Sequence, residues 1–200
     1  TDLKQQTEYF RSVLDAYGRF QVLCAVREGP WGVESLNRII QTQLKKKRLI
    51  TSAGFSDNDW YKGRPVMATR NDYELGIMNG DVGITLSFMD PETGASTLRV
   101  VFKDPENPTH PYKIVLPSRL TDVETVFAMT VHKSQGSEFG HVALMLPDPE
   151  KALVLSRELL YTGITRAKKQ LTLIGGDRDQ FREIIARKTK RSGRLGELLL

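Results

Sequence analysis

The apolar residues of this chain follow two different periods, and the first period is that of a buried strand followed by a helix. Residues 20–26 (F-Q-V-L-C-A-V) are almost continuously apolar, which is typical of a strand in a parallel sheet covered on both faces. A turn at 29–32 (G-P-W-G) follows, and apolar side chains then recur at helical spacing from Val33 to Leu44. This order predicts one half of an α/β unit.

The middle of the chain has a period of two instead. Apolar and polar residues alternate there over several short runs, which is typical of strands with one buried face. The runs lie at 65–69, 84–88, 98–102 and 112–116. The segment Asn79-Gly80-Asp81 supplies turn residues between two of them. About five short strands in about 55 residues predict a small barrel inserted into the α/β fold.

The helical and buried-strand patterns return after this middle segment. They predict strands at 125–131, 142–146 and 171–174, a polar loop at 132–138, and helices at 157–168 and 179–187. We therefore expect an α/β fold with a largely parallel sheet formed by residues 1–60 and 117–200, with residues 61–116 as the inserted barrel. The ligand-binding loops of such a sheet lie at the carboxyl ends of its strands.

The polar segment 130–139 (T-V-H-K-S-Q-G-S-E-F) is the first candidate site. Lysine and glutamine meet phosphate oxygens, hydroxyls donate and accept, glycine lets a ligand approach the backbone, and glutamate accepts from a ribose hydroxyl. The positions with these properties are Thr130, Lys133, Ser134, Gln135, Gly136 and Glu138. The alternative is a capped turn without a ligand, in which His132 bonds only to a neighbouring carbonyl group.

The predicted helix at 157–168 carries the second candidate. Leu160 and Ile164 fall on an apolar face, whereas Thr162, Arg166 and Lys169 share another face at helical spacing. Arg166 is therefore expected to point away from the core. A guanidinium in that position can reach across a cleft to a phosphate, although a lone surface arginine is more often only solvated.

The composition favours a cytosolic protein with a basic end. The net charge is +5, and residues 151–200 hold 12 Lys and Arg against 5 Asp and Glu, which suits a polyanionic partner but also fits a solvated surface. One cysteine and three histidines exclude a disulfide framework and an ordinary structural zinc site. No apolar run reaches the length of about 18 residues that indicates a membrane span.

Four segments resemble motifs of RecD-like superfamily 1 DNA helicases. Residues 130–139 are similar to helicase motif V, 159–168 to motif VI, 24–37 to motif IV, and 63–83 to the entry of the inserted barrel. Their order and spacing also match the C-terminal half of RecD-type subunits. The resemblance implies a RecA-like domain of the P-loop NTPase type (2A), an SH3-like β-barrel inserted in it (2B), and an ATP-dependent motor that moves 5′ to 3′ on DNA.

The same resemblance implies roles for individual residues. Arg166 would contact the γ-phosphate of ATP bound to the preceding domain, with Arg27 as a partner in this catalytic role. The residues implied on the nucleotide side are Gln135, Gly136 and Glu138. The residues implied on the single-stranded DNA side are Thr130, His132, Lys133 and Ser134. The assignment of Gln135 stays open, because its amide suits either ligand.

One half of an ATPase site is missing from this sequence. There is no Gly-Lys-Ser/Thr phosphate loop and no Asp-Glu pair after an apolar strand, so the chain has no cradle for Mg²⁺ and the β- and γ-phosphates. The resemblance implies that a missing N-terminal RecA-like domain supplies this cradle, with ATP and Mg²⁺ as cofactors. We expect the chain alone to hydrolyse no ATP and to bind single-stranded DNA weakly and with strong salt sensitivity.

The resemblance also implies protein partners. They are RecB-like and RecC-like subunits, in an exodeoxyribonuclease V complex acting in double-strand-break repair and recombination. Two other classes of protein remain as alternatives. The first is a non-catalytic module that binds single-stranded DNA or serves as a scaffold. The second is a nuclease, against which the lack of a clustered carboxylate and histidine ligand set argues.

Overall fold

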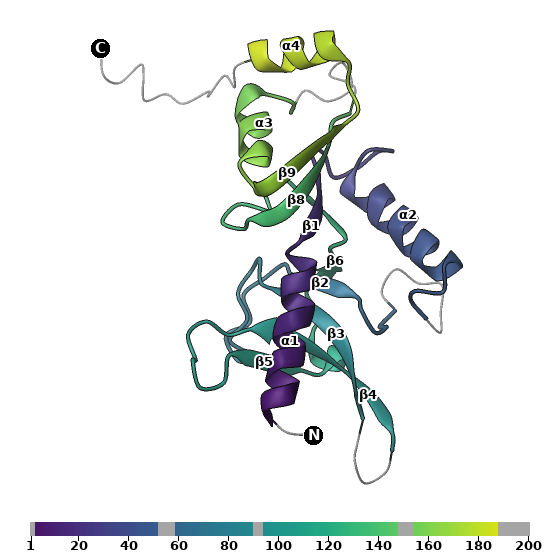
Figure 1. Cartoon of the computed structure of the whole chain (residues 1–200), viewed down its shortest axis with the longest axis vertical. Helices are drawn as coiled ribbons and strands as arrows, with labels where there is room; N and C mark the ends of the chain where they lie inside the picture. Colours follow the sequence, from purple (N-terminus) through teal and green to yellow (C-terminus); the bar gives the residue numbers. More distant parts are fainter. Residues whose placement is uncertain (1–2, 52–58, 90–93, 148–153, 188–200) are drawn as a thin grey trace, which may run out of the picture.

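A computed structural model describes residues 3–51, 59–89, 94–147 and 154–187, and its strands form two separate sheets (Figure 1). The first sheet is parallel, with the order β7-β1-β8-β9. Its strands are β1 (Phe20–Cys24), β7 (Ala128–Thr130), β8 (Phe139–Met145) and β9 (Ala167–Ile174). The apolar run at 20–26 thus forms the strand that was predicted, between two parallel neighbours.

Helices cover both faces of the parallel sheet, as Figure 1 shows. Helix α2 (Val33–Lys46) packs through Val33 against Cys24 and Met145 on one face. Helices α3 (Arg157–Ile164) and α4 (Arg178–Ala186) pack on the other face, where Leu23 and other strand residues form the largest core. A sheet covered on both faces explains why its strands are almost continuously apolar in sequence. The predicted α/β fold with a parallel sheet is confirmed.

The second sheet is antiparallel, with the order β5-β4-β3-β2-β6. Its elements are β2 (Pro65–Ala68), β3 (Val82–Met89), β4 (Ser96–Lys103), β5 (Tyr112–Val115), β6 (Val123–Thr125) and the short 3-10 helix η1 (Pro117–Arg119). Val66, Val100 and Phe102 lie at the centre of its core. A Cβ atom at Gly83 would come within 2.7 Å of Phe102, so this position requires glycine. The strands predicted from the period of two are all present.

The first helix was not predicted from the sequence. Helix α1 (Leu3–Tyr17) packs through Phe10 and Leu14 against Ile84 and Val101 of the antiparallel sheet. It ends at Tyr17, whose hydroxyl donates to the backbone oxygen of Val126 at 2.9 Å, and burial raises the pKa of this phenol. Helix α1 therefore covers the inserted sheet and then leads directly into β1. No helix in the described ranges combines the length and apolar character that a membrane crossing requires.

The strand predicted at 125–131 is wrong in one respect, because it is two strands in two different sheets. Strand β6 ends at Thr125 and pairs with β2, whereas β7 begins at Ala128 and pairs with β1. The backbone N–H of Val126 donates to Pro65 at 3.0 Å, at the point where the chain changes sheet. An unbroken apolar run cannot reveal such a change. Strand β6 belongs to the antiparallel sheet, although it lies beyond residue 116. The division of the chain into 1–60, 61–116 and 117–200 stays a prediction.

The helix predicted at 157–168 is also too long. Helix α3 ends at Ile164, and β9 begins at Ala167, so Arg166 lies in the two-residue link between them. Lys169 belongs to β9, and the helical face predicted for Thr162, Arg166 and Lys169 is therefore wrong. The physical reason is strand pairing, because β9 takes the edge of the parallel sheet beside β8 along its whole length. Pairing of this kind depends on residues distant in sequence.

Burial of Cys24 leads to a first testable expectation. Its side chain is fully buried, and burial raises the pKa of the thiol from 9.0 to about 12. Since the thiolate is the reactive form, iodoacetamide at pH 8 should leave the folded protein unmodified and should label the same thiol quickly in denaturant. The free energy of unfolding should also fall as the pH rises from 9.0 towards 12, because the unfolded chain loses this proton first. Mass spectrometry and denaturation curves would measure the two effects, and labelling of the native chain would contradict the burial.

Candidate functional site

The loop after β7 connects opposite edges of the parallel sheet. It begins beside Thr130, which pairs with Cys24 at the carboxyl ends of β7 and β1. It ends at Phe139, whose N–H donates to the backbone oxygen of Arg166 at 2.8 Å, at the amino ends of β8 and β9. Because these strands are parallel, the loop begins at the carboxyl edge of the sheet and ends at its amino edge. The loop can therefore meet two different ligands.

Internal hydrogen bonds hold the middle of this loop as a turn. The side chain of Ser134 is fully buried, and its hydroxyl donates to the backbone oxygen of Val131 at 2.7 Å. The Thr130 hydroxyl accepts from the N–H of Lys133 at 3.3 Å, and Gly136 has a φ of +84°, which favours glycine. This geometry fits the interpretation of 130–139 as a capped turn. Ser134 supports the turn and does not face solvent, so direct contact with DNA would require the turn to open.

Arg166 is held at the amino edge of the sheet by three neutral acceptors. Its guanidinium donates to the backbone oxygens of Thr162 at 3.2 Å and Ser137 at 3.1 Å, and to the hydroxyl of Thr165 at 3.2 Å. Within the described ranges, no carboxylate lies within ion-pair distance of it. The side chain is half-buried, so its direction is fixed while its charge stays uncompensated. Such a guanidinium is prepared to receive an anion.

Glu138 lies close to Arg166 in the fold, at the same edge. Its carboxylate pairs with the ammonium of Lys168 at 3.1 Å, and both side chains are more than half exposed. An exposed pair of this kind contributes little to stability and exchanges readily with other ligands. Gln135 and Gly136 are exposed in the same half of the loop. The structure thus places the three residues implied for the nucleotide in the half of the loop nearer to Arg166.

Arg27 and Lys133 meet at a different place. Arg27 follows the carboxyl end of β1 and pairs with Glu34 at 3.1 Å and with Glu124 at 3.5 Å. The ammonium of Lys133 lies 2.6 Å from the other oxygen of Glu124. The role of Glu124 could not be predicted from the sequence, because nothing in its local pattern indicates that β6 comes next to these loops.

The structure does not bring Arg27 and Arg166 together. Arg27 lies beyond the carboxyl end of β1, and Arg166 lies before the amino end of β9, two strands away in the sheet. At the usual rise per residue, the five residues of β1 alone separate these edges by on the order of 15 Å. The shared role of the two arginines at one γ-phosphate therefore stays a prediction, and the strand order does not favour it.

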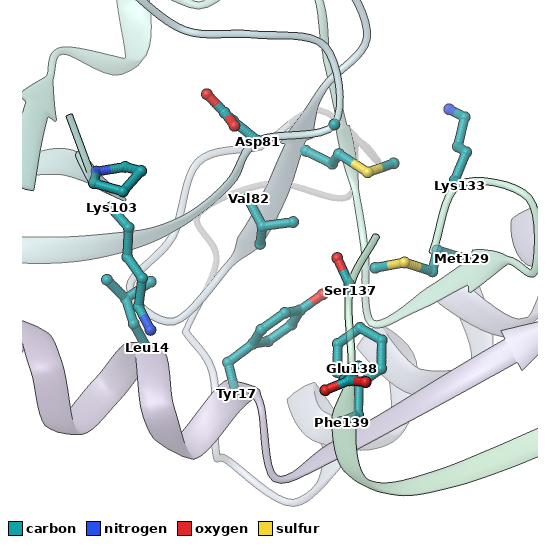
Figure 2. A pocket seen from close by; sticks show the side chains of 13 residues that line it. Leu14, Tyr17, Asp81, Val82, Lys103, Met129, Lys133, Ser137, Glu138 and Phe139 are labelled. Atoms are coloured by element: carbon teal, nitrogen blue, oxygen red, sulfur yellow. The ribbon is translucent and has the colours of Figure 1, made fainter. Parts of the chain in front are cut away.

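A pocket of about 370 Å³ lies between the two sheets (Figure 2). Tyr17 and Phe139 contribute apolar surface to it, and its charged groups come from Asp81, Lys103, Lys133 and Glu138. Its walls come from α1, from β3 and β4, and from the loop after β7. This pocket could not be predicted from the sequence, since the lining residues are distant in the chain. Within the described ranges no group of three His, Cys, Asp or Glu residues could hold a metal, and the Mg²⁺ ligands implied for a preceding domain stay a prediction.

Two family models match this chain. Residues 125–174 match the UvrD-like helicase C-terminal domain, a range that contains the loop after β7 and Arg166. Residues 36–102 match the SH3 domain of ATP-dependent RecD-like DNA helicases, a range that contains β2, β3 and β4. These matches agree with the parallel sheet and the inserted antiparallel sheet. The predicted class, a RecA-like helicase fold with an SH3-like insertion, is confirmed.

The chain is also similar to individual proteins. The chain is 37% identical to the RecBCD enzyme subunit RecD of Haemophilus influenzae over 98% of its own length and 27% of that protein. It is 39% identical to the subunit of the same name from Mycobacterium tuberculosis, over 86% of this chain and 28% of that protein. The chain therefore spans about a quarter of the length of these curated relatives. A solved Pif1 helicase from Bacteroides, with ADP-AlF3 and single-stranded DNA, is 16% identical over 86% of this chain and 43% of that chain, with a TM-score of 0.48.

Proposed function

Because this chain is a homologue of the C-terminal portion of RecD helicase subunits, we propose that it is the second motor domain of an ATP-dependent DNA helicase. The observation that supports this proposal most directly is the hydrogen bonding of the Arg166 guanidinium. Its guanidinium is fixed in direction by neutral acceptors and has no carboxylate partner among the described residues. In this proposal a preceding RecA-like domain binds ATP and Mg²⁺, and the chain supplies the other half of the active site.

Arg166 acts on the transferred phosphate in this mechanism. The transition state of phosphoryl transfer spreads negative charge over the equatorial oxygens, and an arginine supplied across a cleft stabilises that charge. The exposed residues Gln135, Gly136 and Glu138 lie in the half of the loop nearer to Arg166 and would contact the nucleotide from this side. Glu138 can leave its exposed pair with Lys168 to accept from a ribose hydroxyl.

Single-stranded DNA would bind at the other half of the loop. His132 is exposed there, and Thr130 and Lys133 lie at the carboxyl edge of the sheet. We assign Arg27 to this DNA side instead of the nucleotide side, because it shares Glu124 with Lys133 and lies far from Arg166. Ser134 supports the turn that presents these residues.

The two ligand sites would be coupled through the loop that joins them. Closure of the cleft on ATP and its opening after hydrolysis would move the DNA stepwise between a binding site on each of the two motor domains.

From the resemblance to RecD-type helicases, we propose 5′ to 3′ movement and assembly with RecB-like and RecC-like subunits in exodeoxyribonuclease V, with a role in double-strand-break repair. A cytoplasmic location stays a prediction that rests on cysteine usage.

Strand displacement with tailed duplexes tests this function. The full-length protein with ATP and Mg²⁺ should unwind a duplex with a 5′ single-stranded tail and should fail on a matched duplex with a 3′ tail. The 200-residue chain alone should show no ATP turnover above a blank. Unwinding from the 3′ tail would contradict the polarity. An absence of unwinding and of ATP turnover in the full-length protein would contradict the motor itself.

A further inference from the structure

Glu124 holds two cations in the way a phosphate group would. One carboxylate oxygen lies 2.6 Å from the ammonium of Lys133, and the other lies 3.5 Å from the guanidinium of Arg27. The two cations come from separate loops, and the carboxylate is the group that they share. A phosphodiester offers two such oxygens with a single negative charge, so it could replace the carboxylate between them.

We propose that Arg27 and Lys133 form a site for one phosphodiester of single-stranded DNA, and that Glu124 occupies this site until DNA displaces it. The inference rests on the DNA half of the proposed function. It goes further by joining Arg27 and Lys133 in one phosphate site and by naming Glu124 as an internal competitor for that site. Glu124 is thus a positioning residue that touches no ligand in the bound state.

The surroundings leave room for the incoming phosphate. A cavity of about 280 Å³ adjoins Arg27 and Glu124, and Glu34, Arg38 and Arg64 also line it. Lys133 instead lines the pocket between the two sheets. The Arg27 side chain is 57% exposed, so a ligand can reach it without a change of the core. Glu34 bonds to the Nε of Arg27 and leaves the other nitrogens of the guanidinium available. Arg27 therefore keeps its direction when Glu124 leaves.

The position of Glu124 gives the exchange a structural consequence. Glu124 lies in β6 and pairs with Met67 of β2, so it belongs to the inserted sheet. Arg27 and Lys133 follow strands of the parallel sheet. The two ion pairs are therefore bridges between the sheets, and a phosphate at the site removes both bridges. The inserted sheet would in this way respond to occupancy by DNA.

Substitution of Glu124 in the full-length protein tests the proposal, with binding to oligodeoxythymidine measured by fluorescence anisotropy over a range of KCl concentrations. Glu124→Gln keeps the shape and removes the competing charge, so single-stranded DNA should bind at least about fivefold more tightly at low salt. The slope of log K against log salt should steepen by about 0.7, because the bound phosphate then releases its counterion without a carboxylate taking one up. Glu124→Asp should behave much like the wild type.

Glu74→Gln is the matched control. It removes the same charge from a side chain that is 90% exposed and 4.0 Å from its partner Arg119, so affinity and slope should stay near the wild-type values. Lys133→Gln should cancel the gain made by Glu124→Gln. On its own it should weaken binding severalfold, and this second variant keeps the test available if Glu124→Gln does not fold.

The outcomes separate this inference from the motor proposal. The competitor role would be overturned if Glu124→Gln had the affinity and salt slope of the wild type. It would also be overturned if the tighter DNA binding of Glu124→Gln persisted when Lys133→Gln was added. Neither result would contradict the motor proposal. An unchanged affinity and salt slope in Lys133→Gln would overturn the phosphate site and would not contradict the motor proposal. Tighter binding by Glu124→Gln combined with full ATP turnover in an Arg166 variant would support the phosphate site and contradict the role of Arg166 in ATP hydrolysis. Absence of DNA binding in every variant would overturn both.

Discussion

Replacement of Arg166 by alanine in the full-length protein should lower DNA-stimulated ATP turnover by a factor of about 10³ or more, the range seen for arginines supplied across a cleft. The affinity for single-stranded DNA should change little, because Arg166 lies before the amino end of β9, whereas Arg27 follows the carboxyl end of β1. Steady-state ATPase assays and DNA titrations would measure the two effects. The loss should fall on kcat, since the contact strengthens as charge develops in the transition state.

Two further variants separate chemistry from folding. Arg157→Ala removes an exposed arginine from the first turn of α3, the helix that precedes Arg166, and should leave ATP turnover within about twofold of the wild type, because surface substitutions are mostly near-neutral. Arg166→Lys keeps the charge but loses the planar set of donors that bonds to Thr162, Ser137 and Thr165, so it should recover only part of the rate. Unchanged turnover in Arg166→Ala would favour the scaffold interpretation.

The order of strands and helices could be predicted from the sequence because it depends on local periods. The run at 20–26 and the alternation at 84–88 each became the expected strand. The errors fell where pairing with distant residues decides the structure. A strand can change sheet between Thr125 and Ala128 without a break in its apolar pattern, and pairing with β8 extends β9 into the predicted helix. Helix α1 was missed, although Phe10 and Leu14 share the face that contacts the inserted sheet.

The candidate site could be predicted only as far as it depends on residues that are close together in the sequence. The resemblance of 130–139 to helicase motif V implied a nucleotide side and a DNA side, and the structure shows that this loop runs from the carboxyl edge of the sheet to its amino edge. The assignment of these sides to ligands stays a prediction. The sequence could not show that Arg27 lies with Lys133, since their shared partner Glu124 comes from the other sheet. Spacing along one chain shows nothing of such contacts.

The position of the loop after β7 also depends on a contact between α2 and the edge of the parallel sheet. Strand β7 lies at the edge of the parallel sheet, and Ala128 turns its N–H and C=O away from β1. The buried side-chain amide of Asn37 accepts from that N–H and donates to that C=O, both at 2.9 Å. Asn37 thus takes the place of a further strand. It fixes the strand that leads into Thr130, so a change here should affect both stability and the site.

Asn37→Leu should therefore lower the free energy of unfolding by about 2–5 kcal/mol, because it leaves two buried backbone groups of Ala128 without partners at about 1–3 kcal/mol each. Urea denaturation followed by circular dichroism would measure the loss. Gln43→Leu introduces the same side chain at an exposed position of the same helix, so its effect should stay within about 0.5 kcal/mol. Equal stabilities of the two variants would mean that water replaces the amide at Ala128. The edge of β7 would then be open to solvent, and the loop would be held by its own turn alone.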